Sequence, residues 1–461
     1  MAAAPLPLPA MVDPARDPVC FLTVAELASR YRNGSLSPVD VVTAMLARIE
    51  RLNPELAAYY ELHPDWSLEQ ARASEQRWRA GAPLGGLDGV PVSIKDHLEV
   101  RGWKNARGHA TDKLAPLAFD SPVAARLREA GAVMMGKTTM PELSVIPVTT
   151  TRAWGATRNP WNTAHSAGGS SGGAAAAVAA GLCTIAMGSD GGGSIRLPAS
   201  FASLVGHKPT LGRVPYFPGQ TDRTVAGPLA RCAADAAAAM NAVARPDGRD
   251  WMELAPDPVD YVAALDSPPL GLRVAWSPDF GYQRVDPEVA ALAEAALARL
   301  GAIASGIEPL ARVCADPFRI YMSQAALRLR QTPRRDGEPR AIASVLDYAA
   351  TLTPEDLQHL VDERNRLGVA FTSLFARADI LVSPTSPVTA PRIGELYPDG
   401  DTLGEANRNL IGFCAPINLV HLPAISLPCG FTRAGLPVGL QIAGPKGSDA
   451  LLLRMAHALG A

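Results

Sequence analysis

Two turns rich in glycine and serine lie close together in this chain, and they restrict how it can fold. The first reads GGSSGG (168–173) and the second DGGGS (190–194), with an alanine-rich run and a short apolar segment between them. Glycine loses much backbone entropy on folding, so such clusters around serines indicate special backbone angles or close approach to a ligand. Flexible linkers are the alternative, but the alanine-rich run is typical of packed structure and not of a Gly/Ser spacer.

The composition is that of a compact globule. Of the 461 residues, 48% are hydrophobic and 19% charged, which argues against extensive disorder. The formal net charge of −2 offers no bulk attraction to nucleic acid or to an anionic membrane. We therefore expect neither as a partner, and a small neutral substrate is more compatible with this charge.

Targeting and redox signals are weak. The six cysteines are scattered without a C-x-x-C pair, which favours a reduced, cytoplasmic protein without a metal site. Residues 1–22 have neither a basic segment nor a continuous apolar run, so we expect a disordered or extended tail and no signal peptide. The apolar run at 174–180 is too short to span a bilayer.

Helical and strand patterns alternate along the chain, which predicts an α/β fold. Segments that read as helices are 38–53, a helix capped by Ser67 that runs to about 80, 121–130, 173–180, 286–300, 321–329 and 354–375. Segments that read as strands are 90–96, 132–136, 182–187, 271–276, 379–384, 424–428 and 438–443. The turn-rich segment 152–167 is expected to be loop, and the helices of 222–379 to shape a substrate pocket.

Two familiar explanations of the glycine-rich turns fit poorly. A phosphate-binding loop needs a lysine after the glycines, and none follows either turn. The pattern G-x-S-x-G of a nucleophile elbow occurs twice, at 168–172 and 169–173, but it requires a strand directly before the serine, where a polar loop lies. Its acid and base would be Asp379 with His421 or His457, and no pattern supports them.

A lysine base is the third explanation. A serine hydroxyl is a poor nucleophile unless a neighbour takes its proton, and a lysine can do so only when burial or nearby cations keep it neutral. Lys95 ends an apolar strand, where such desolvation is expected. The plain alternative is a strand-end lysine paired with Asp96.

Three motifs decide between these readings by resemblance. VSIKD (92–96), GGSSGG (168–173) and GSDGGGSIR (188–196), with intervals of 75 and 24 between the reactive positions, resemble the amidase signature family. The likeness extends over 120–142, 157–161, 206–210, 227–231 and 422–444. It implies a single domain at 23–461, with a large mixed β-sheet flanked by α-helices.

The resemblance also implies a role for each reactive residue. Ser194 is the expected nucleophile that becomes acylated, Ser170 the serine that relays protons, and Lys95 the base. Ser170 is expected to follow a cis peptide bond after Gly169. The backbone N–H groups expected to form the oxyanion hole are those of Gly191, Gly192, Gly193 and Ser194.

Residues around these turns are expected to support them. Ser171 resembles a hydrogen-bonding partner behind the reactive groups, and Asp190 with Arg196 a local salt bridge that braces the loop. Many family members carry a bulkier residue at the position of Gly191 and an apolar one at that of His207, which predicts a more open or polar rim here. His207 itself is expected to be a packed or bracing histidine.

The resemblance implies hydrolysis of a small aryl or alkyl amide through an acyl-enzyme, with carbamates and esters as related substrates and no cofactor or metal. Aromatic and sulfur-containing side chains that could line the pocket are Trp154, Phe201, Tyr216, Phe217, Tyr321 and Met322. We expect a monomer or homodimer. The alternatives are the glutaminase subunit of a tRNA-dependent amidotransferase and a noncatalytic binding protein on the same fold.

Overall fold

The computed structural model describes residues 8–110, 114–219, 222–330, 332, 339–395 and 405–461. Its main element is a sheet of 11 strands in the order β1-β3-β2-β8-β10-β9-β14-β15-β13-β11-β12. The strands of this sheet are β1 (Tyr59–Leu62), β2 (Pro91–Lys95), β3 (Val133–Thr138), β8 (Ile185–Asp190), β9 (Val205–Lys208), β10 (Val225–Ala230), β11 (Leu272–Trp276), β12 (Ala304–Pro309), β13 (Ile380–Pro384), β14 (Ala424–Phe431) and β15 (Pro437–Ala443).

The sheet is mixed, as the resemblance implied. Strand β2 runs parallel to both β3 and β8, and β11 runs parallel to β12 and β13, whereas β8, β10, β9, β14, β15 and β13 pair antiparallel in turn. The α-helices are α1 (Val24–Asn33), α2 (Pro38–Leu56), α3 (Pro64–Arg79), α4 (Pro122–Glu129), α5 (Gly172–Ala179), α6 (Arg196–Phe201), α7 (Ala233–Val243), α8 (Pro287–Ala296), α9 (Phe318–Leu329), α10 (Arg340–Thr351), α11 (Pro354–Phe375), α12 (Glu405–Ile411), α13 (Ala415–Leu419) and α14 (Asp449–Ala458).

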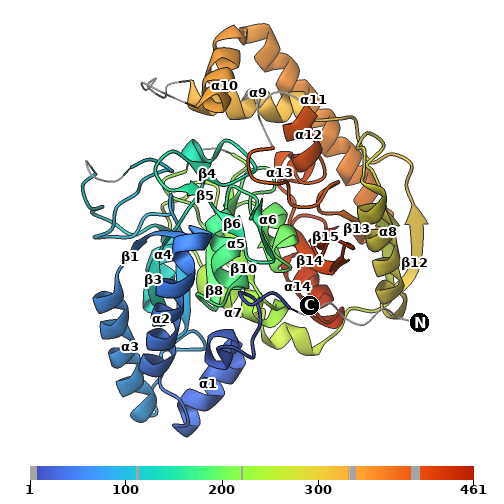
Figure 1. Cartoon of the computed structure of the whole chain (residues 1–461). Helices are drawn as coiled ribbons and strands as arrows, with labels where there is room; N and C mark the ends of the chain where they lie inside the picture. The colour runs from blue at the N-terminus through green and yellow to red at the C-terminus, as the bar shows by residue number, and fades with distance from the viewer. Residues whose placement is uncertain (1–7, 111–113, 220–221, 331, 333–338, 396–404) are drawn as a thin grey trace.

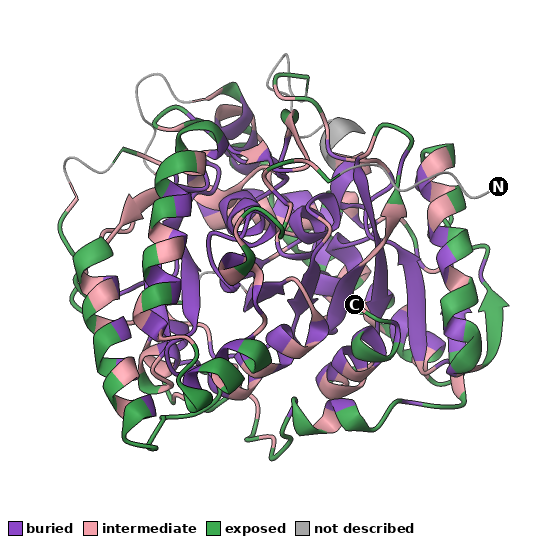
Figure 2. Cartoon of the chain, turned by 60° about the horizontal axis from the view of Figure 1, so that its bottom comes forward, coloured by how far each residue is buried: buried purple, intermediate pink, exposed green. Residues whose placement is uncertain are grey.

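The sheet lies inside the molecule and the helices surround it (Figure 1). Buried residues follow its strands, while the surrounding helices are buried on one side and exposed on the other (Figure 2). One large apolar cluster fills this interior, so the expectation of an α/β fold with a large mixed sheet is confirmed.

Several predicted boundaries need correction. Ser37 caps α2 through a capping box as expected, but the helix continues through Pro54 to Leu56. Helix α3 begins at Pro64, and Ser67 lies inside it, where its hydroxyl donates to the His63 and Met134 carbonyls. These two internal acceptors explain why a good capping residue is tolerated within a helix.

The segment expected to be loop at 152–167 contains short strands. They are β5 (Gly155–Ala156), which pairs with β4 (Thr150–Thr151), and β6 (Arg158–Asn159), which pairs with β7 (Asn162–Ser166). The two-residue pieces are too short to show an alternating pattern. They bring the chain back to Gly168, where the first glycine-rich turn begins.

The N-terminal segment is partly described. Residues 1–7 of the expected tail lie outside the described residues. A short helix, η1 (Pro18–Phe21), follows, and Cys20 within it is buried. Arg48 of α2 forms an ion pair with Asp17, so this part of the chain packs against the domain.

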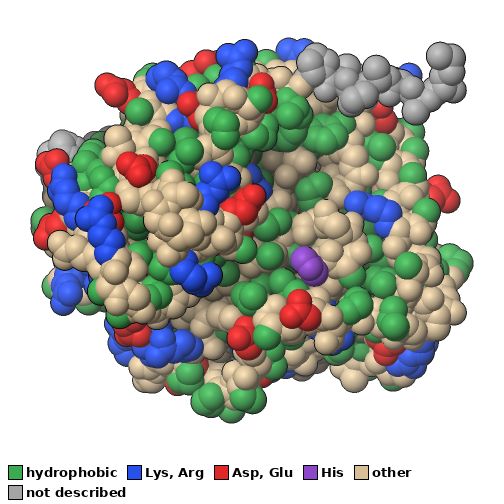
Figure 3. Space-filling model, turned by 90° about the horizontal axis from the view of Figure 1, so that it is seen from below, with side chains coloured by type: hydrophobic (Ala, Val, Ile, Leu, Met, Phe, Trp, Pro, Cys, Tyr) green, Lys and Arg blue, Asp and Glu red, His purple; other side chains and the backbone are tan. Residues whose placement is uncertain are grey.

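The outer surface carries both charge signs. On the face in Figure 3, basic and acidic side chains are interspersed with hydrophobic ones, in line with the near-balanced formal charge. Of the helices in the described ranges, none combines the length and apolar character needed to cross a bilayer.

Candidate active site

Lys95 is completely buried at the end of β2, a strand that is buried along its whole length. Its Nζ donates to the Ser170 hydroxyl at 2.7 Å and to the Ser189 hydroxyl at 3.1 Å. Burial lowers the pKa of the Lys95 amine well below its usual value, although the nearby charge of Asp190 works in the opposite direction. The geometry therefore favours an uncharged amine in contact with a serine hydroxyl.

Asp96 does not pair with Lys95. Its carboxylate accepts hydrogen bonds from the Tyr60 hydroxyl at 2.7 Å and from the backbone N–H groups of Ala106 and Gly108 at 2.8 and 2.6 Å. The plain alternative of a strand-end lysine paired with its neighbour is therefore wrong. Asp96 holds the loop that follows β2.

Ser170 lies in the first glycine-rich turn, just before α5. The peptide bond between Gly169 and Ser170 is cis, as the resemblance implied. A Cβ on Gly169 would approach the Val148 backbone N to 2.8 Å, so only glycine fits the backbone here. The Ser170 hydroxyl contacts both the Lys95 amine and the Ser144 hydroxyl.

Ser194 lies in the second turn, after β8, and lines a cavity together with Ser170 and Gly191. Among the hydrogen bonds of the described residues, none joins the Ser194 and Ser170 hydroxyls, because Ser170 contacts Ser144 instead. The expected relay from Ser194 to Ser170 therefore needs a rotation of one hydroxyl.

The backbone N–H groups of the second turn differ in their partners. That of Gly193 donates to Asp190 Oδ1 at 2.7 Å, so in this structure it does not point to a substrate oxygen. Gly193 has a φ of +120°, and a Cβ there would lie 2.7 Å from the Cys414 Cβ. The expected set of four donors is thus reduced to Gly191, Gly192 and Ser194.

A buried salt bridge braces this turn. Asp190 and Arg196 are fully buried, and Arg196 Nε lies 2.9 Å from Asp190 Oδ2. Burial by itself raises the pKa of the Asp190 carboxyl, but the Arg196 guanidinium more than offsets this and holds that pKa well below its usual range. Arg196 also donates to Gln441 Oε1 at 2.6 Å and to Asn418 Oδ1 at 2.5 Å, which ties the turn to the C-terminal part of the chain.

Ser171 connects the two turns. Its N–H donates to the Ser194 carbonyl at 3.1 Å, and its hydroxyl donates to the Ser189 carbonyl at 3.2 Å and accepts from the Ser189 N–H at 3.3 Å. These three bonds fix the distance between the turns independently of α5, which lies between them in sequence.

The cavity beside these serines is narrow. Its volume is about 40 Å³, and it shares His97, Ser144, Arg328 and Leu329 with an adjoining cavity of about 330 Å³. Ligand sites typically occupy 300–1,000 Å³, so the outer cavity supplies most of the room for a substrate.

Only part of the expected aromatic lining reaches the cavity. Tyr216 and Tyr321 line it, whereas Phe201 and Met322 are buried in separate apolar clusters. The other two rings pack against aromatic neighbours: Trp154 stacks on Tyr60 at 4.5 Å, and Phe217 lies 6.0 Å from Phe119. Distance along the chain could not separate these cases.

Sequence reasoning missed three residues around Lys95. Ser189 accepts from the amine and stands inside a motif already singled out. His97 lies two residues after Lys95 and lines both cavities, and burial and the Lys95 charge lower the pKa of its ring well below the usual value. Ser144 has no sequence signal, because it reaches Ser170 from a turn in which its own φ is +60°.

The two departures from the family pattern have local explanations. A Cβ on Gly191 would lie 2.8 Å from the Thr224 hydroxyl, so the rim is polar at this point and not open. His207 is fully buried on β9, with Nε2 3.4 Å from Asp449 Oδ1. That position agrees with a packed, bracing histidine.

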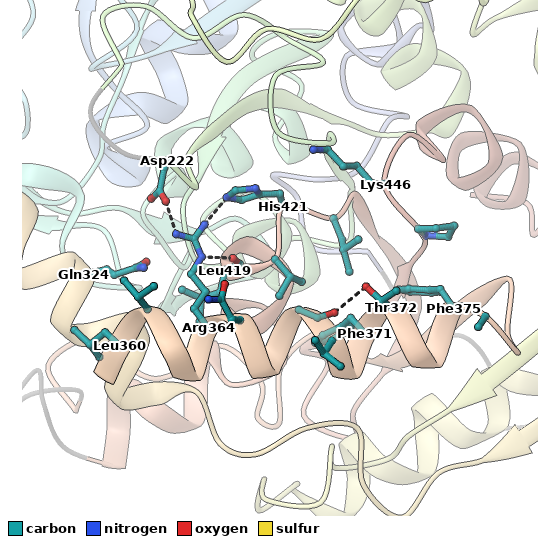
Figure 4. Close-up of a pocket in the computed structure, with 18 of the residues that line it drawn as sticks. Asp222, Gln324, Leu360, Arg364, Phe371, Thr372, Phe375, Leu419, His421 and Lys446 are labelled. Carbon is teal, nitrogen blue, oxygen red and sulfur yellow. Dashed lines mark hydrogen bonds and ion pairs between the residues drawn. The ribbon is translucent and has the colours of Figure 1, made fainter. Parts of the chain in front are cut away.

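A larger hollow of about 1,200 Å³ runs along α11 (Figure 4). At one end, Arg364 bonds to Asp222 and to His421. Its lining includes none of the three reactive residues.

The partners that a nucleophile elbow would need are engaged elsewhere. His421 contacts Arg364, and Asp379 forms an ion pair with Arg273 at 2.7 Å. His457 lies on α14, outside the residues that line the serine cavity. The elbow therefore has no acid and base in this structure.

Comparisons with known proteins agree with the geometry. The family model described as Amidase matches residues 40–453. An acylamidase of Rhodococcus erythropolis is 34% identical over 452 residues, covering 95% of this chain and 94% of its own. One subunit of the glutamyl-tRNA(Gln) amidotransferase of Myxococcus xanthus is also 34% identical, over 475 residues, covering 95% and 96%. The crystal structure of a bacterial aryl acylamidase of the amidase signature family superposes with a TM-score of 0.87 at 28% identity, covering 96% of each chain.

Proposed function

Because this chain belongs to the amidase family, whose signature its motifs carry, we propose that it hydrolyses small amides through an acyl-enzyme on Ser194. The enzyme class follows from the family: it is a hydrolase of carbon–nitrogen bonds other than peptide bonds. The observation that carries the proposal is the contact between a buried, uncharged Lys95 amine and the Ser170 hydroxyl, in the cavity that Ser194 lines.

The proposed reaction starts with proton transfer. Ser170 gives its proton to neutral Lys95 and takes the proton of Ser194, whose oxygen attacks the substrate carbonyl carbon. The N–H groups of Gly191, Gly192 and Ser194 donate to the oxyanion that forms. When the carbon–nitrogen bond breaks, the proton held by Lys95 passes through Ser170 to the departing amine.

A second half-reaction regenerates the enzyme. Water gives a proton to the same relay, attacks the acyl carbon and releases the carboxylic acid. The Ser194 oxygen then recovers its proton from Lys95 through Ser170. The narrow cavity limits the number of water molecules beside the ester, so the outer cavity is the expected route for water.

Labelling tests this assignment. A sulfonyl fluoride should modify Ser194 and abolish amide hydrolysis, and Ser194→Ala should lose both the label and the activity. Attachment at Ser144, Ser170 or Ser189, which line the same cavity, or full activity in Ser194→Ala, would refute the proposal.

The proposed substrates are aryl or alkyl amides, supported by the acylamidase and aryl acylamidase relatives. Carbamates and esters share the acyl-transfer chemistry and belong to the same test. Values of kcat/KM for matched anilides, primary amides, aryl carbamates and esters would rank them. Faster turnover of every carbamate than of its matched amide would overturn the preference.

A glutaminase subunit is the second candidate, because one chain of an amidotransferase is as similar in sequence as the acylamidase. Such a subunit would act on glutamine within a complex. Turnover of anilides but not of glutamine by the purified chain alone would exclude it. A noncatalytic binding protein is disfavoured, because Lys95, Ser170 and Ser194 are all present.

A further inference from the structure

Arginine side chains gather on one side of the reactive cavity. Arg223 and Arg328 line the narrow cavity beside Ser194, and Arg328 and Arg107 line the adjoining outer cavity. Among the described residues that line these two cavities, none is an aspartate or a glutamate. The substrate space is therefore strongly basic, although the whole chain has a formal charge of only −2.

Two of these guanidinium groups are held by nearby backbone and ring atoms. Arg223 is 4% exposed; its Nη1 donates to the Tyr321 carbonyl at 3.1 Å, and its Cζ lies 4.4 Å from the centre of the Tyr321 ring. Arg328 comes from the last turn of α9, and its Nη2 donates to the Leu143 carbonyl at 2.9 Å. These contacts fix the side chains without neutralising their charge.

The two charges act on each other. Burial and the charge of Arg223 lower the pKa of Arg328 to about 10, so both side chains still carry a positive charge at neutral pH. Like charges in a poorly hydrated cavity repel, and an anion placed beside them relieves this repulsion. A guanidinium also presents paired N–H donors that match the two oxygens of a carboxylate.

We propose that the enzyme selects amides whose acyl part ends in a carboxylate, with Arg328 as the main carboxylate partner and Arg107 as the second, at the mouth of the outer cavity. This inference rests on the proposed function, since it assigns a substrate class to the same site. It also revises the expectation of a neutral substrate, which came from net charge alone. Net charge averages over the whole surface, whereas these arginines lie together in the cavities.

A pair of chromogenic anilides tests the inference. Succinyl-4-nitroanilide carries the carboxylate, and 4-methylpentanoyl-4-nitroanilide replaces it with an uncharged group of similar shape. The preference is the ratio of their kcat/KM values, measured from released 4-nitroaniline. The unmodified enzyme should prefer the succinyl compound, and Arg328→Gln should lower the preference by about 10- to 100-fold, the range for a lost charge-assisted hydrogen bond.

Two further variants make the test specific. Arg107→Gln, at an exposed side chain, should also lower the preference, and it serves if Arg328→Gln fails to fold. Arg330→Gln is the matched control, because Arg330 is exposed two residues away and lines neither cavity. It should retain the preference of the unmodified enzyme.

The outcomes separate this inference from the proposed function. Hydrolysis of the neutral anilide with labelling of Ser194, but no preference for the succinyl compound, would overturn the inference alone. An equal loss of preference in Arg330→Gln and Arg328→Gln would also overturn it, because the effect would then reflect overall charge. If neither anilide is hydrolysed and Ser194 is not labelled, both proposals fail.

Discussion

Replacing Lys95 with methionine tests the base most directly. Methionine has a similar length but carries no proton, and the change removes the hydrogen bonds to the Ser170 and Ser189 hydroxyls, which measure 2.7 and 3.1 Å. A positioned general base typically accelerates a reaction by about 10²- to 10⁴-fold, so Lys95→Met should slow acylation by at least that range. Stopped-flow measurement of 4-nitroaniline release from an anilide gives the acylation rate.

The pH profile separates loss of a base from loss of packing. Burial holds the pKa of Lys95 well below 10.5, and only the neutral amine can take a proton. In the unmodified enzyme kcat/KM should therefore fall about tenfold per pH unit as the pH drops below that pKa. Lys95→Met should lack this acid limb in the activity that remains.

Lys137→Met is the matched control. Lys137 is also fully buried, and burial lowers the pKa of its amine to about 8, but its Nζ donates to the Asp96 and Leu98 carbonyls and does not line the serine cavity. It should keep the acid limb even if it loses stability. An acylation rate in Lys95→Met within about tenfold of the unmodified enzyme, or an unchanged acid limb, would refute the role of Lys95 as base.

The same substitution has a predictable effect on stability. In the unfolded chain a lysine has a pKa of about 10.4, so between the lowered pKa of Lys95 and that value the unfolded state binds more protons. The stability of the unmodified enzyme therefore gains about 1.4 kcal/mol per pH unit from this group in that window. The unfolding free energy of Lys95→Met, relative to the unmodified enzyme, should fall by the same amount as the pH rises, and denaturant titrations at several pH values measure it.

Two more substitutions test neighbours of the reactive serines. Ser144→Ala removes the hydroxyl that contacts Ser170, and one hydrogen bond of about 0.5–1.5 kcal/mol corresponds to about 3- to 10-fold in the acylation rate, with KM little changed; an unchanged rate would show that the contact does not bear on catalysis. Asp190→Asn leaves the charge of buried Arg196 without its carboxylate, which should lower the unfolding free energy by about 3–5 kcal/mol in a denaturant titration. A loss below about 1 kcal/mol would contradict the bracing role of this pair.

Much of the sheet could be predicted from the chain alone. Strands β2, β3, β8, β11, β13, β14 and β15 overlap segments that read as strands. Strand β10 was missed, because it contains Gly227 and Pro228, which favour turns in sequence reasoning. The Pro228 position is tolerated within a strand whose neighbours β8 and β9 pair with it only in part.

The site was predictable only where its residues stand in motifs. Lys95, Ser170 and Ser194 come from the three motifs, and the structure brings Lys95 against Ser170 across 75 residues of chain. Ser144 and Arg328 stand in segments without a signal, because their positions depend on how a left-handed turn and α9 pack against the glycine-rich turns. The Gly193 N–H was assigned to the oxyanion, but the sequence cannot reveal that the Asp190 carboxylate accepts it.

The packing divides chemistry from substrate selection. The turns that hold Ser170 and Ser194 are joined by hydrogen bonds through Ser171 and lie on the central sheet, so their geometry is set by the main core. Helix α9, which carries Arg328, packs with α10 around a separate small apolar cluster. Substitutions in that cluster can shift α9 without disturbing the reactive serines, and this separation is a physical reason why relatives about equally similar to this chain include both an acylamidase and a chain of an amidotransferase.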